Sequence, residues 1–308
     1  AYRHFHALHY GHINPNAKND TDLISSGSDN VIYTTPFIRL EKEEIRKKES
    51  KDLISDLNRG LEVVPQVIFK NEHELRRLIE ILDSEGHKHI DLNMGCPFPL
   101  QTSRGRGAAT IANEECHLAV SNIVNEYGNI HFSVKIRLGY DKEEYIPLIE
   151  NLNSVKLDYI TVHPRTAKDQ YTGPLHIEAF EDIYKRSKNP IIYNGDIKTP
   201  EEAMEIFTKY SDLGGLMIGR GALARPSIFR EIISGEEWDS ERRRHELLFF
   251  HKELLNYYKE SLIGGEHQVL SKILPFWEYS EEEIGRKAWK AIKKSSNMSK
   301  YLTALTLI

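Results

Sequence analysis

The chain has 308 residues and a formal net charge of −5 at pH 7, and 40% of its residues are hydrophobic and 28% charged. These values are ordinary for a globular protein, and the length allows one large domain or one domain with a smaller appendage. A mean hydropathy of −0.50 and the lack of any apolar run of about 18 residues predict no membrane span, and no secretory leader opens the chain.

The cysteine content is low. Cys96 and Cys116 are too few for a disulfide scaffold and lack the spacing of a metal site. We therefore expect a reducing, cytoplasmic setting and no bound metal.

The chain begins with a helical pattern at about residue 2, followed by a polar stretch, 14–30, that we expect to be a long surface loop. Short β-branched runs then alternate with helical patterns up to about residue 220. Because most of these runs are apolar throughout, they predict parallel strands covered on both faces. The expected strands are 31–35, 63–69, 90–94, 132–136, 159–162, 191–193 and 216–218.

Helix-start signals lie between the runs. Asn71 with Glu74 has the spacing of a capping box, and so does Thr199 with Glu202, where Pro200 takes the first helical position. Strands that alternate with helices predict an α/β fold. The runs are one strand short of an eightfold barrel, so we expect a (β/α)8 TIM barrel whose first strand is missing from this chain. A seven-stranded open sheet is the alternative.

The pattern changes after about residue 226. Apolar residues recur at helical spacing over 247–258, a glycine pair at 264–265 interrupts them, and Ser280 with Glu283 predicts the start of a further helix. We expect two domains, a barrel over 1–235 and a C-terminal helical bundle over 240–308.

Cys96 lies where an apolar strand runs into a glycine-rich loop. It lies in the segment DLNMGCP at 91–97, just before the final proline, and glycines and alanines follow at 105–109. In α/β proteins, the carboxyl ends of strands carry the chemistry. A thiol is mostly protonated near neutral pH and can donate a proton. We therefore expect Cys96 to be catalytic, although a lone cysteine is also commonly a small buried hydrophobe. Cys116 fits packing in a helix.

Two cations interrupt a later strand. Lys135 lies in an otherwise apolar run, where a buried ammonium needs a partner, and Arg137 shares its face. A ligand with an anionic ring edge would supply that partner. The alternative is a lysine that reaches out between helices.

The loop after the next strand combines a histidine, cations and an aromatic ring. His163, Arg165, Lys168 and Tyr171 follow the run 159–162 closely. Such a loop suits an anionic, stackable ligand such as RNA.

Two glycine loops end the last two strands. Asn194, Gly195 and Asp196 follow one strand, and Gly219 and Arg220 follow the other. In barrels, loops at these places commonly bind phosphate through backbone N–H groups, and an arginine adds a charge-assisted donor.

Gln66 places an amide in the strand 63–69, where it would face a barrel mouth that is otherwise apolar. With Lys135 at the ring and the glycine loops at the phosphate, these residues account for a whole flavin mononucleotide (FMN). Taken alone, Gln66 is equally well an edge or buried amide.

The C-terminal segment is basic. From residue 285 to the end no acidic residue occurs, and the basic residues are Arg286, Lys287, Lys290, Lys293, Lys294 and Lys300. The segment permits contact with RNA phosphates, and a solvated helix face is the plain alternative.

The run 93–97, the GRGAA that follows it at 105–109 and the HPRTAK at 163–168 resemble the tRNA-dihydrouridine synthase family. The resemblance implies an FMN-bearing barrel with a C-terminal helical domain that uses NADPH to reduce uridines in tRNA, with no obligate protein partner and no membrane. It implies hydride transfer from the flavin to C6 of uracil and protonation of C5 by Cys96. Asn93 would contact the uracil. The residues that would hold FMN are Gln66, Lys135, His163, Asn194, Gly195, Asp196, Gly219 and Arg220.

The remaining expected contacts are with the substrate or its RNA. They are Arg137, Arg165, Lys168, Tyr171, Lys290, Lys293 and Lys294. Two other functions stay open: an FMN-dependent dehydrogenase of a free pyrimidine, similar to dihydroorotate dehydrogenase, and a flavin-free RNA-binding barrel. The missing first strand would remove one flavin contact.

Overall fold

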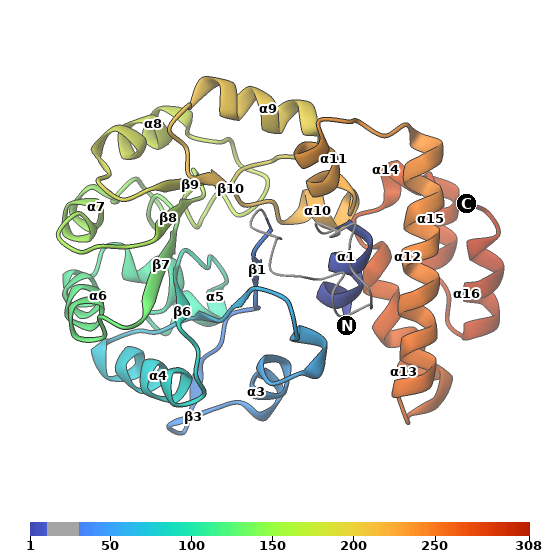
Figure 1. Ribbon diagram of the computed structural model, residues 1–308, viewed down its shortest axis with the longest axis horizontal. Helices are drawn as coiled ribbons and strands as arrows, with labels where there is room; N and C mark the ends of the chain where they lie inside the picture. The colour runs from blue at the N-terminus through green and yellow to red at the C-terminus, as the bar shows by residue number, and fades with distance from the viewer. Residues whose placement is uncertain (11–30) are drawn as a thin grey trace.

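The computed structural model describes residues 1–10 and 31–308 (Figure 1). The polar stretch 14–30 lies outside the described residues. A body of parallel strands ringed by helices forms one side of the molecule, and a group of helices from the C-terminal quarter forms the other.

The strands run parallel and follow one another in chain order. The short strand β1 pairs with β4, and β5 begins a six-stranded sheet in the order β5, β6, β7, β8, β9 and β10. Because β4 and β5 are separated only by Pro65, the stretch 63–67 pairs with β1 at one end and with β6 at the other. The bounds are β1 (Tyr33–Thr34), β4 (Val63–Val64), β5 (Gln66–Val67), β6 (His89–Met94), β7 (His131–Ile136), β8 (Tyr159–Val162), β9 (Ile191–Tyr193) and β10 (Gly215–Leu216).

Helices cover the outer side of these parallel strands, as Figure 1 shows for α4, α6, α7, α8 and α9. The α/β class predicted from the sequence is confirmed, and strands and helices alternate as in a (β/α)8 barrel. Among the described strands, β10 and β1 are not hydrogen-bonded to each other. The helices of this body are α3 (Lys47–Leu53), α4 (Glu72–Ser84), α5 (Pro99–Thr102), α6 (Glu114–Glu126), α7 (Ile146–Leu152), α8 (Ile177–Arg186), α9 (Pro200–Lys209), α10 (Arg220–Ala224) and α11 (Ile228–Ser234), with short 3-10 turns at η1 (Asp56–Asn58) and η2 (Gly107–Thr110).

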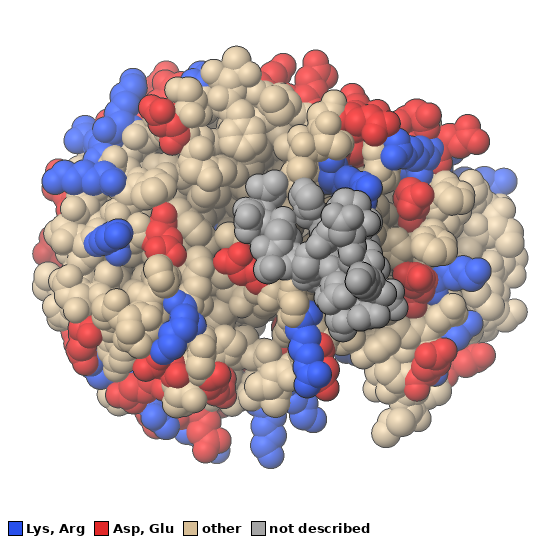
Figure 2. Space-filling model, in the orientation of Figure 1, with Lys and Arg blue, Asp and Glu red and all other residues tan. Residues whose placement is uncertain are grey.

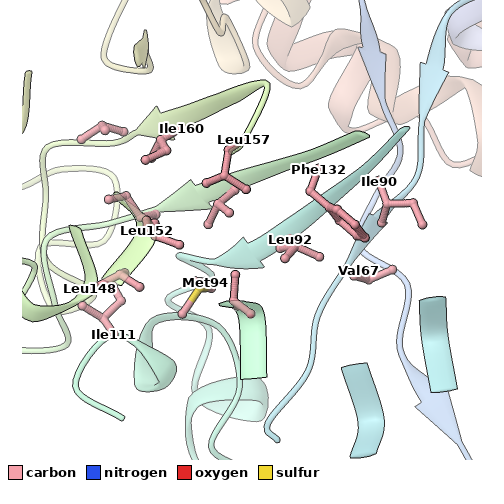
Figure 3. Packing of buried hydrophobic residues seen from close by; sticks show 14 of the residues in the cluster. Val67, Ile90, Leu92, Met94, Ile111, Phe132, Leu148, Leu152, Leu157 and Ile160 are labelled. Carbon is pink, nitrogen blue, oxygen red and sulfur yellow. The ribbon is translucent and has the colours of Figure 1, made fainter. Parts of the chain in front are cut away.

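The first hydrophobic core lies between the strands and their helices (Figure 3). Leu92, Phe132 and Ile160 come from three neighbouring strands, while Leu148 and Leu152 come from α7. Their side chains are almost fully buried, which explains why these strands are apolar along their whole length. The packing gives the strand ends a rigid support.

A second hydrophobic core joins the C-terminal helices. Phe250, Trp277 and Tyr301 lie at its centre, and Tyr10 of the N-terminal helix α1 (Tyr2–Tyr10) packs among them. In Figure 1, α1 accordingly lies beside α12. The division into domains 1–235 and 240–308 stays a prediction. The C-terminal helices are α12 (Ser240–Ser261), α13 (Gly265–Ile273), η3 (Leu274–Trp277), α14 (Glu281–Ile284), α15 (Arg286–Lys293) and α16 (Met298–Leu305).

The two cores are joined through a buried hydrogen-bonded histidine. His6 of α1 lies 2.8 Å from the Tyr33 hydroxyl of β1 and 2.9 Å from the backbone oxygen of Pro226. Because the carbonyl oxygen can only accept, Nε2 of His6 donates to it and Nδ1 accepts from Tyr33. One side chain thus ties α1 to β1 and to the segment between α10 and α11.

The observed helix caps can be compared with the three capping boxes predicted from the sequence. Thr199 and Glu202 form the full capping box, as predicted. Of the box predicted at Asn71 only one half forms: Asn71 accepts from the backbone N–H of Glu74, while the Glu74 side chain binds Arg106. The capping box expected at Ser280 is wrong. The Ser280 hydroxyl makes no cap hydrogen bond, since the backbone N–H of Glu283 donates to the Ser280 carbonyl oxygen instead, at 3.1 Å. The Glu283 side chain accepts from Arg243 of α12 at 2.9 Å.

An antiparallel hairpin, β2 (Leu40–Glu41) with β3 (Glu44–Ile45), was not predicted. Its turn places Lys42 and Glu43 at φ values of 52° and 65°, without the glycine or asparagine that marks such turns in a sequence. No helix in the part of the chain that the structure describes is long and apolar enough to cross a membrane.

Candidate active site

The predicted site residues gather at the carboxyl ends of neighbouring parallel strands. Gln66 lies in β5, Asn93 in β6 and Lys135 in β7, and Cys96 and His163 follow β6 and β8 directly. The register pairs Asn93 with Lys135. Because the strands are parallel, their ends bring these side chains to one edge of the sheet.

The backbone around Cys96 is held from several sides. The Asn93 side-chain oxygen accepts from the N–H groups of Gly95 at 3.1 Å and of Cys96 at 2.9 Å, and the N–H of Ala108 donates to the Cys96 carbonyl at 3.0 Å. Gly107 has a φ of 61°, and a Cβ there would lie 2.6 Å from the Cys96 carbonyl oxygen. The glycine therefore lets the loop approach the cysteine closely.

A buried ion pair anchors the same loop to α4. The Arg106 guanidinium binds both carboxylate oxygens of Glu74, at 2.6 and 3.1 Å, and both residues are almost fully buried. Such bidentate pairs fix geometry as well as charge. The loop behind Cys96 is thus attached both to the strand end and to a helix.

Burial keeps the Cys96 thiol protonated. The residue is 6% exposed, and burial raises the pKa of its thiol, although the Phe98 backbone, Arg137 and Lys135 act to lower it. A thiol in this state can act as a proton donor at neutral pH. The two nearby cations would then stabilise the thiolate that remains.

The Lys135 ammonium makes no hydrogen bond or ion pair among the described residues. Burial and the neighbouring Arg137 lower the pKa of Lys135 to about 8, while Asp91 and Cys96 act in the opposite direction. Two buried polar atoms close to it along the strands, Nη2 of Arg137 and Oγ1 of Thr161, also have no partner in the described part of the chain. Buried donors without partners are the sort of groups that a ligand would satisfy.

Gln66 and Asn93 form one hydrogen-bonded chain with a buried carboxylate. The Asn93 amide donates to the Gln66 oxygen at 2.6 Å, and the Gln66 amide donates to Asp91 at 2.7 Å. Ser133 donates to the other oxygen of Asp91 at 2.7 Å. Gln66 is thus a buried amide in a connected network.

His163 is neutral. Burial and four surrounding cations, Lys135, Arg137, Arg165 and Arg220, lower its pKa to about 2. Nη1 of Arg165 lies 3.3 Å from Nε2 of His163. Because a guanidinium can only donate, Nε2 accepts and the ring proton is on Nδ1, which is then a donor.

Tyr171 lies between two arginines. The guanidinium carbons of Arg137 and Arg220 lie 5.1 and 4.9 Å from the centre of its ring, which is within the range of cation–π attraction. The ring centres of His163 and Phe98 lie 6.3 and 6.4 Å away. Arg137 itself is 1% exposed and donates to the carbonyls of Thr166 and Gln170, so this loop is fixed by it.

Asp196 binds two arginines. Its carboxylate accepts from Arg165 at 2.5 and 3.0 Å and from Arg220 at 2.7 Å, and the Arg165 hydrogen bond lowers the pKa of Asp196. Arg165 is 3% exposed and also donates to the Gly173 carbonyl. These contacts account for Arg165 without an RNA contact, which stays a prediction.

The two glycine loops lie next to each other. The Asn194 amide, after β9, donates to the Met217 carbonyl, after β10, at 2.7 Å. A Cβ at Gly195 would lie 2.3 Å from the Tyr193 hydroxyl, and a Cβ at Gly219 would meet no atom within 4 Å. Phosphate binding by these loops stays a prediction.

Four of the basic residues predicted to meet RNA are exposed, whereas Arg137 and Arg165 are buried. Lys290, Lys293 and Lys294 lie on α15 and at its end, with the Lys293 ammonium 4.7 Å from the ring centre of Trp289, and Lys168 pairs with Asp141 at 3.2 Å. Basic and acidic side chains are interspersed on the face drawn in Figure 2.

Three features of the site were not predicted. Asp91 is an acidic residue in an apolar strand and could have been noticed, since Asp91 and Asn93 point to the same face. Phe98, 50% exposed beside Tyr171, and the Arg106–Glu74 pair had no sequence signal, because their partners are distant in the chain.

A family model described as dihydrouridine synthase matches residues 21–299 of the chain. A probable tRNA-dihydrouridine synthase of Helicobacter pylori strain J99 is 31% identical over 170 residues, which cover 54% of this chain and 52% of the relative. The tRNA-dihydrouridine synthase B of Pseudomonas aeruginosa is 32% identical over 149 residues, which cover 48% of this chain and 45% of the relative.

The tRNA-dihydrouridine(20a/20b) synthase [NAD(P)+] of Saccharomyces cerevisiae is 31% identical over 207 residues, which cover 65% of this chain and 55% of the relative. The chain thus spans about half the length of the curated relatives that it matches.

Proposed function

Because this chain belongs to the dihydrouridine synthase family, we propose that it reduces specific uridines in tRNA to 5,6-dihydrouridine, with FMN as cofactor and NADPH as reductant. The observation that carries the proposal is the Cys96 thiol, kept protonated by burial, at the strand edge that also presents Lys135, Arg137 and neutral His163.

The residues at this edge fit a flavin ring. Its N1–C2=O edge carries negative charge when reduced, and the ammonium of Lys135 has no other partner among the described residues. The amide of Gln66 and Nδ1 of His163 supply further donors. The residues proposed to hold FMN are Gln66, Lys135, His163, Asn194, Gly195, Asp196, Gly219 and Arg220.

When bound, the flavin would supply a hydride to C6 of the uracil. Cys96 would give its proton to C5, and Arg137 and Lys135 would stabilise the thiolate. Asn93 would hold the base through its amide. Arg137 and Tyr171 would form the wall on which the base rests, and the base must leave the stack of its RNA to arrive there.

The helix α15 would contact the RNA backbone through Lys290, Lys293 and Lys294, with Lys168 and Arg165 at the mouth of the barrel. We propose a cytoplasmic location, where tRNA is available, and no obligate protein partner. A dehydrogenase of a free pyrimidine would share the flavin residues but would need no basic tail. A flavin-free RNA-binding barrel would have no use for Cys96.

The test is an absorbance spectrum of the purified protein between about 300 and 500 nm, where oxidised flavins absorb. We expect flavin bands that NADPH bleaches and that tRNA from a dihydrouridine-deficient strain restores. Restoration by a free pyrimidine and not by tRNA would favour the dehydrogenase. A colourless protein that FMN cannot reconstitute but that binds tRNA would favour the binding barrel.

A further inference from the structure

Asp91 is a buried carboxylate that makes no ion pair in the described part of the chain, although its charge acts on the nearby Lys135. Asp91 is 1% exposed and lies in β6, in register with Gln66 of β5 and Ser133 of β7. Its two oxygens accept from the Gln66 amide and the Ser133 hydroxyl, both at 2.7 Å. A buried charge of this kind is costly unless such donors satisfy it.

The charge decides which way the neighbouring amides face. A carboxylate can only accept, so the Gln66 side chain must turn its NH2 group to Asp91 and its oxygen to Asn93. The Asn93 side chain then turns its NH2 group to that oxygen, at 2.6 Å.

The other end of this hydrogen-bonded series, at the cysteine loop, requires the same orientation of the Asn93 amide. The Asn93 oxygen accepts from the backbone N–H groups of Gly95 and Cys96, which would lose their partner if the amide turned over. The direction of the hydrogen bonds therefore runs from the cysteine loop to Asp91 without a conflict. Each of the two NH2 groups keeps one hydrogen for a further partner.

We propose that Asp91 is a positioning residue whose carboxylate holds the amides of Gln66 and Asn93 with their remaining N–H groups available to a ligand. The ligand must then offer acceptors at this place, such as carbonyl oxygens. That these carbonyls belong to the flavin and the uracil rests on the proposed function. The orientation of the amides does not.

Two substitutions test the orientation of the Gln66 and Asn93 amides without any ligand. Asn93→Asp keeps an acceptor for the cysteine loop but places a second carboxylate against the Gln66 amide, which can donate to only one of the two. Asp91→Asn, added to Asn93→Asp, removes this conflict. Gln66 turns over and donates to the new carboxylate at position 93, while the new amide at position 91 donates to Gln66 and accepts from Ser133.

We expect Asn93→Asp to lower the thermal unfolding midpoint by about 5 °C or more, and the double variant to recover at least half of this loss. If Asn93→Asp does not fold, a double variant that folds shows the same rescue. A double variant at or below the midpoint of Asn93→Asp, or one that also fails to fold, would overturn the proposal.

The effect of Asp91 on cofactor binding is measured as the affinity for FMN, by titrating FMN with protein and following the quenching of its fluorescence. Asp91→Asn is expected to weaken FMN binding about fivefold or more, because a charge-assisted bond becomes a neutral one. Asp158→Asn makes the same chemical change at a carboxylate bonded to His131, and should stay within about twofold of the unmodified chain. Equal FMN affinity in Asp91→Asn and Asp158→Asn would refute the role of Asp91 toward the cofactor.

Failure of the proposed function and failure of the inference about Asp91 give different results. If the unmodified chain binds no FMN, the proposed function is wrong, and the unfolding comparison still decides the role of Asp91. If it binds FMN and the double variant shows no rescue, the proposed function stands and the inference about Asp91 does not.

Discussion

At the scale of single residues, the site depends on the state of protonation that burial imposes. The Cys96 thiol stays protonated because burial opposes its ionisation, and His163 stays neutral because burial and four cations oppose its charge. Each group therefore has a defined hydrogen to offer at neutral pH. Neither state can be derived from residue type alone.

Replacement of Cys96 by alanine tests the proton donor. We expect Cys96→Ala to retain FMN but to lose most reduction of tRNA, by about a hundredfold or more, because protonation of C5 loses its donor. The measurement is dihydrouridine formed per enzyme. Cys116→Ala is the matched control, since this thiol is also buried and its hydrogen bond among the described residues is to the Lys70 carbonyl. Full activity of Cys96→Ala would exclude the proposed role.

Replacement of Lys135 or Arg220 by alanine tests where the flavin lies. We expect both variants to retain less FMN after gel filtration, because each removes a positive charge proposed to meet the ring or the phosphate. Lys88→Ala removes an exposed lysine that pairs with Asp83, and serves as the control. Flavin content equal to the control in both variants would contradict the placement of the cofactor.

At the scale of elements, the loop 104–109 positions the cysteine. The Arg106–Glu74 pair attaches it to α4, and the N–H of Ala108 attaches it to the end of β6. Gly107 allows the close approach between the two backbones. Regular structure in this loop is limited to the short 3-10 turn η2, so the geometry of the loop depends on these contacts.

Substitutions at two glycines of this loop allow the cost of backbone strain to be measured apart from the cost of a close contact. Gly105 and Gly107 both have positive φ, 74° and 61°, but a Cβ at Gly105 meets only the Lys70 Cβ at 3.8 Å. We expect Gly105→Ala to cost about 1 kcal/mol through strain alone. Gly107→Ala should cost more and also reduce the rate of tRNA reduction, because the Cys96 carbonyl must move. Urea unfolding and activity measure this, and equal effects of the two variants would contradict it.

At the scale of the whole molecule, buried histidines connect parts that are distant in the chain. His6 joins α1 to β1 and to Pro226, and His251 of α12 lies 2.6 Å from the Tyr301 hydroxyl of α16. Burial lowers the pKa of His6 to about 4 and that of His251 to about 3. In the folded chain both rings are therefore neutral near neutral pH.

The pH dependence of stability follows from these values. Between about pH 6.5 and pH 4 the unfolded chain binds protons at these histidines and the folded chain does not, so the free energy of unfolding should decrease as the pH falls. His251→Gln should make this decrease shallower by up to about 1.4 kcal/mol per pH unit. Urea unfolding across this range measures it. The exposed His245→Gln on the same helix is the control, and an equal slope in both variants would argue against this origin.

The C-terminal lysines offer a test of RNA contact. Replacing Lys290, Lys293 and Lys294 by alanine should weaken tRNA binding and reduce its salt dependence, because each phosphate contact releases counterions. The matched control replaces three lysines of the exposed helix α3, Lys47, Lys48 and Lys51. Binding titrations at several salt concentrations measure the slope. Equal slopes in the two triple variants would place the RNA elsewhere.

The sequence by itself determined the strands, most helix starts and the residues at the strand ends, because apolar runs, caps and glycine loops are local signals. It also singled out Cys96, Lys135 and His163 from their unusual neighbours. It missed the β2–β3 hairpin, whose turn has no glycine, and it misplaced a cap at Ser280, where the Glu283 N–H donates to the Ser280 backbone oxygen and the Glu283 side chain binds Arg243.

Only the tertiary structure decided how these residues act on one another. The Asp91–Gln66–Asn93 chain, the arginines on either side of Tyr171 and the packing of α1 against the C-terminal helices join positions that lie far apart in sequence. Burial and the direction of hydrogen bonds arise from all the neighbours of a group at once. For that reason the protonation of Cys96 and the orientation of the amides follow from the fold, whereas the identity of the residues follows from the sequence.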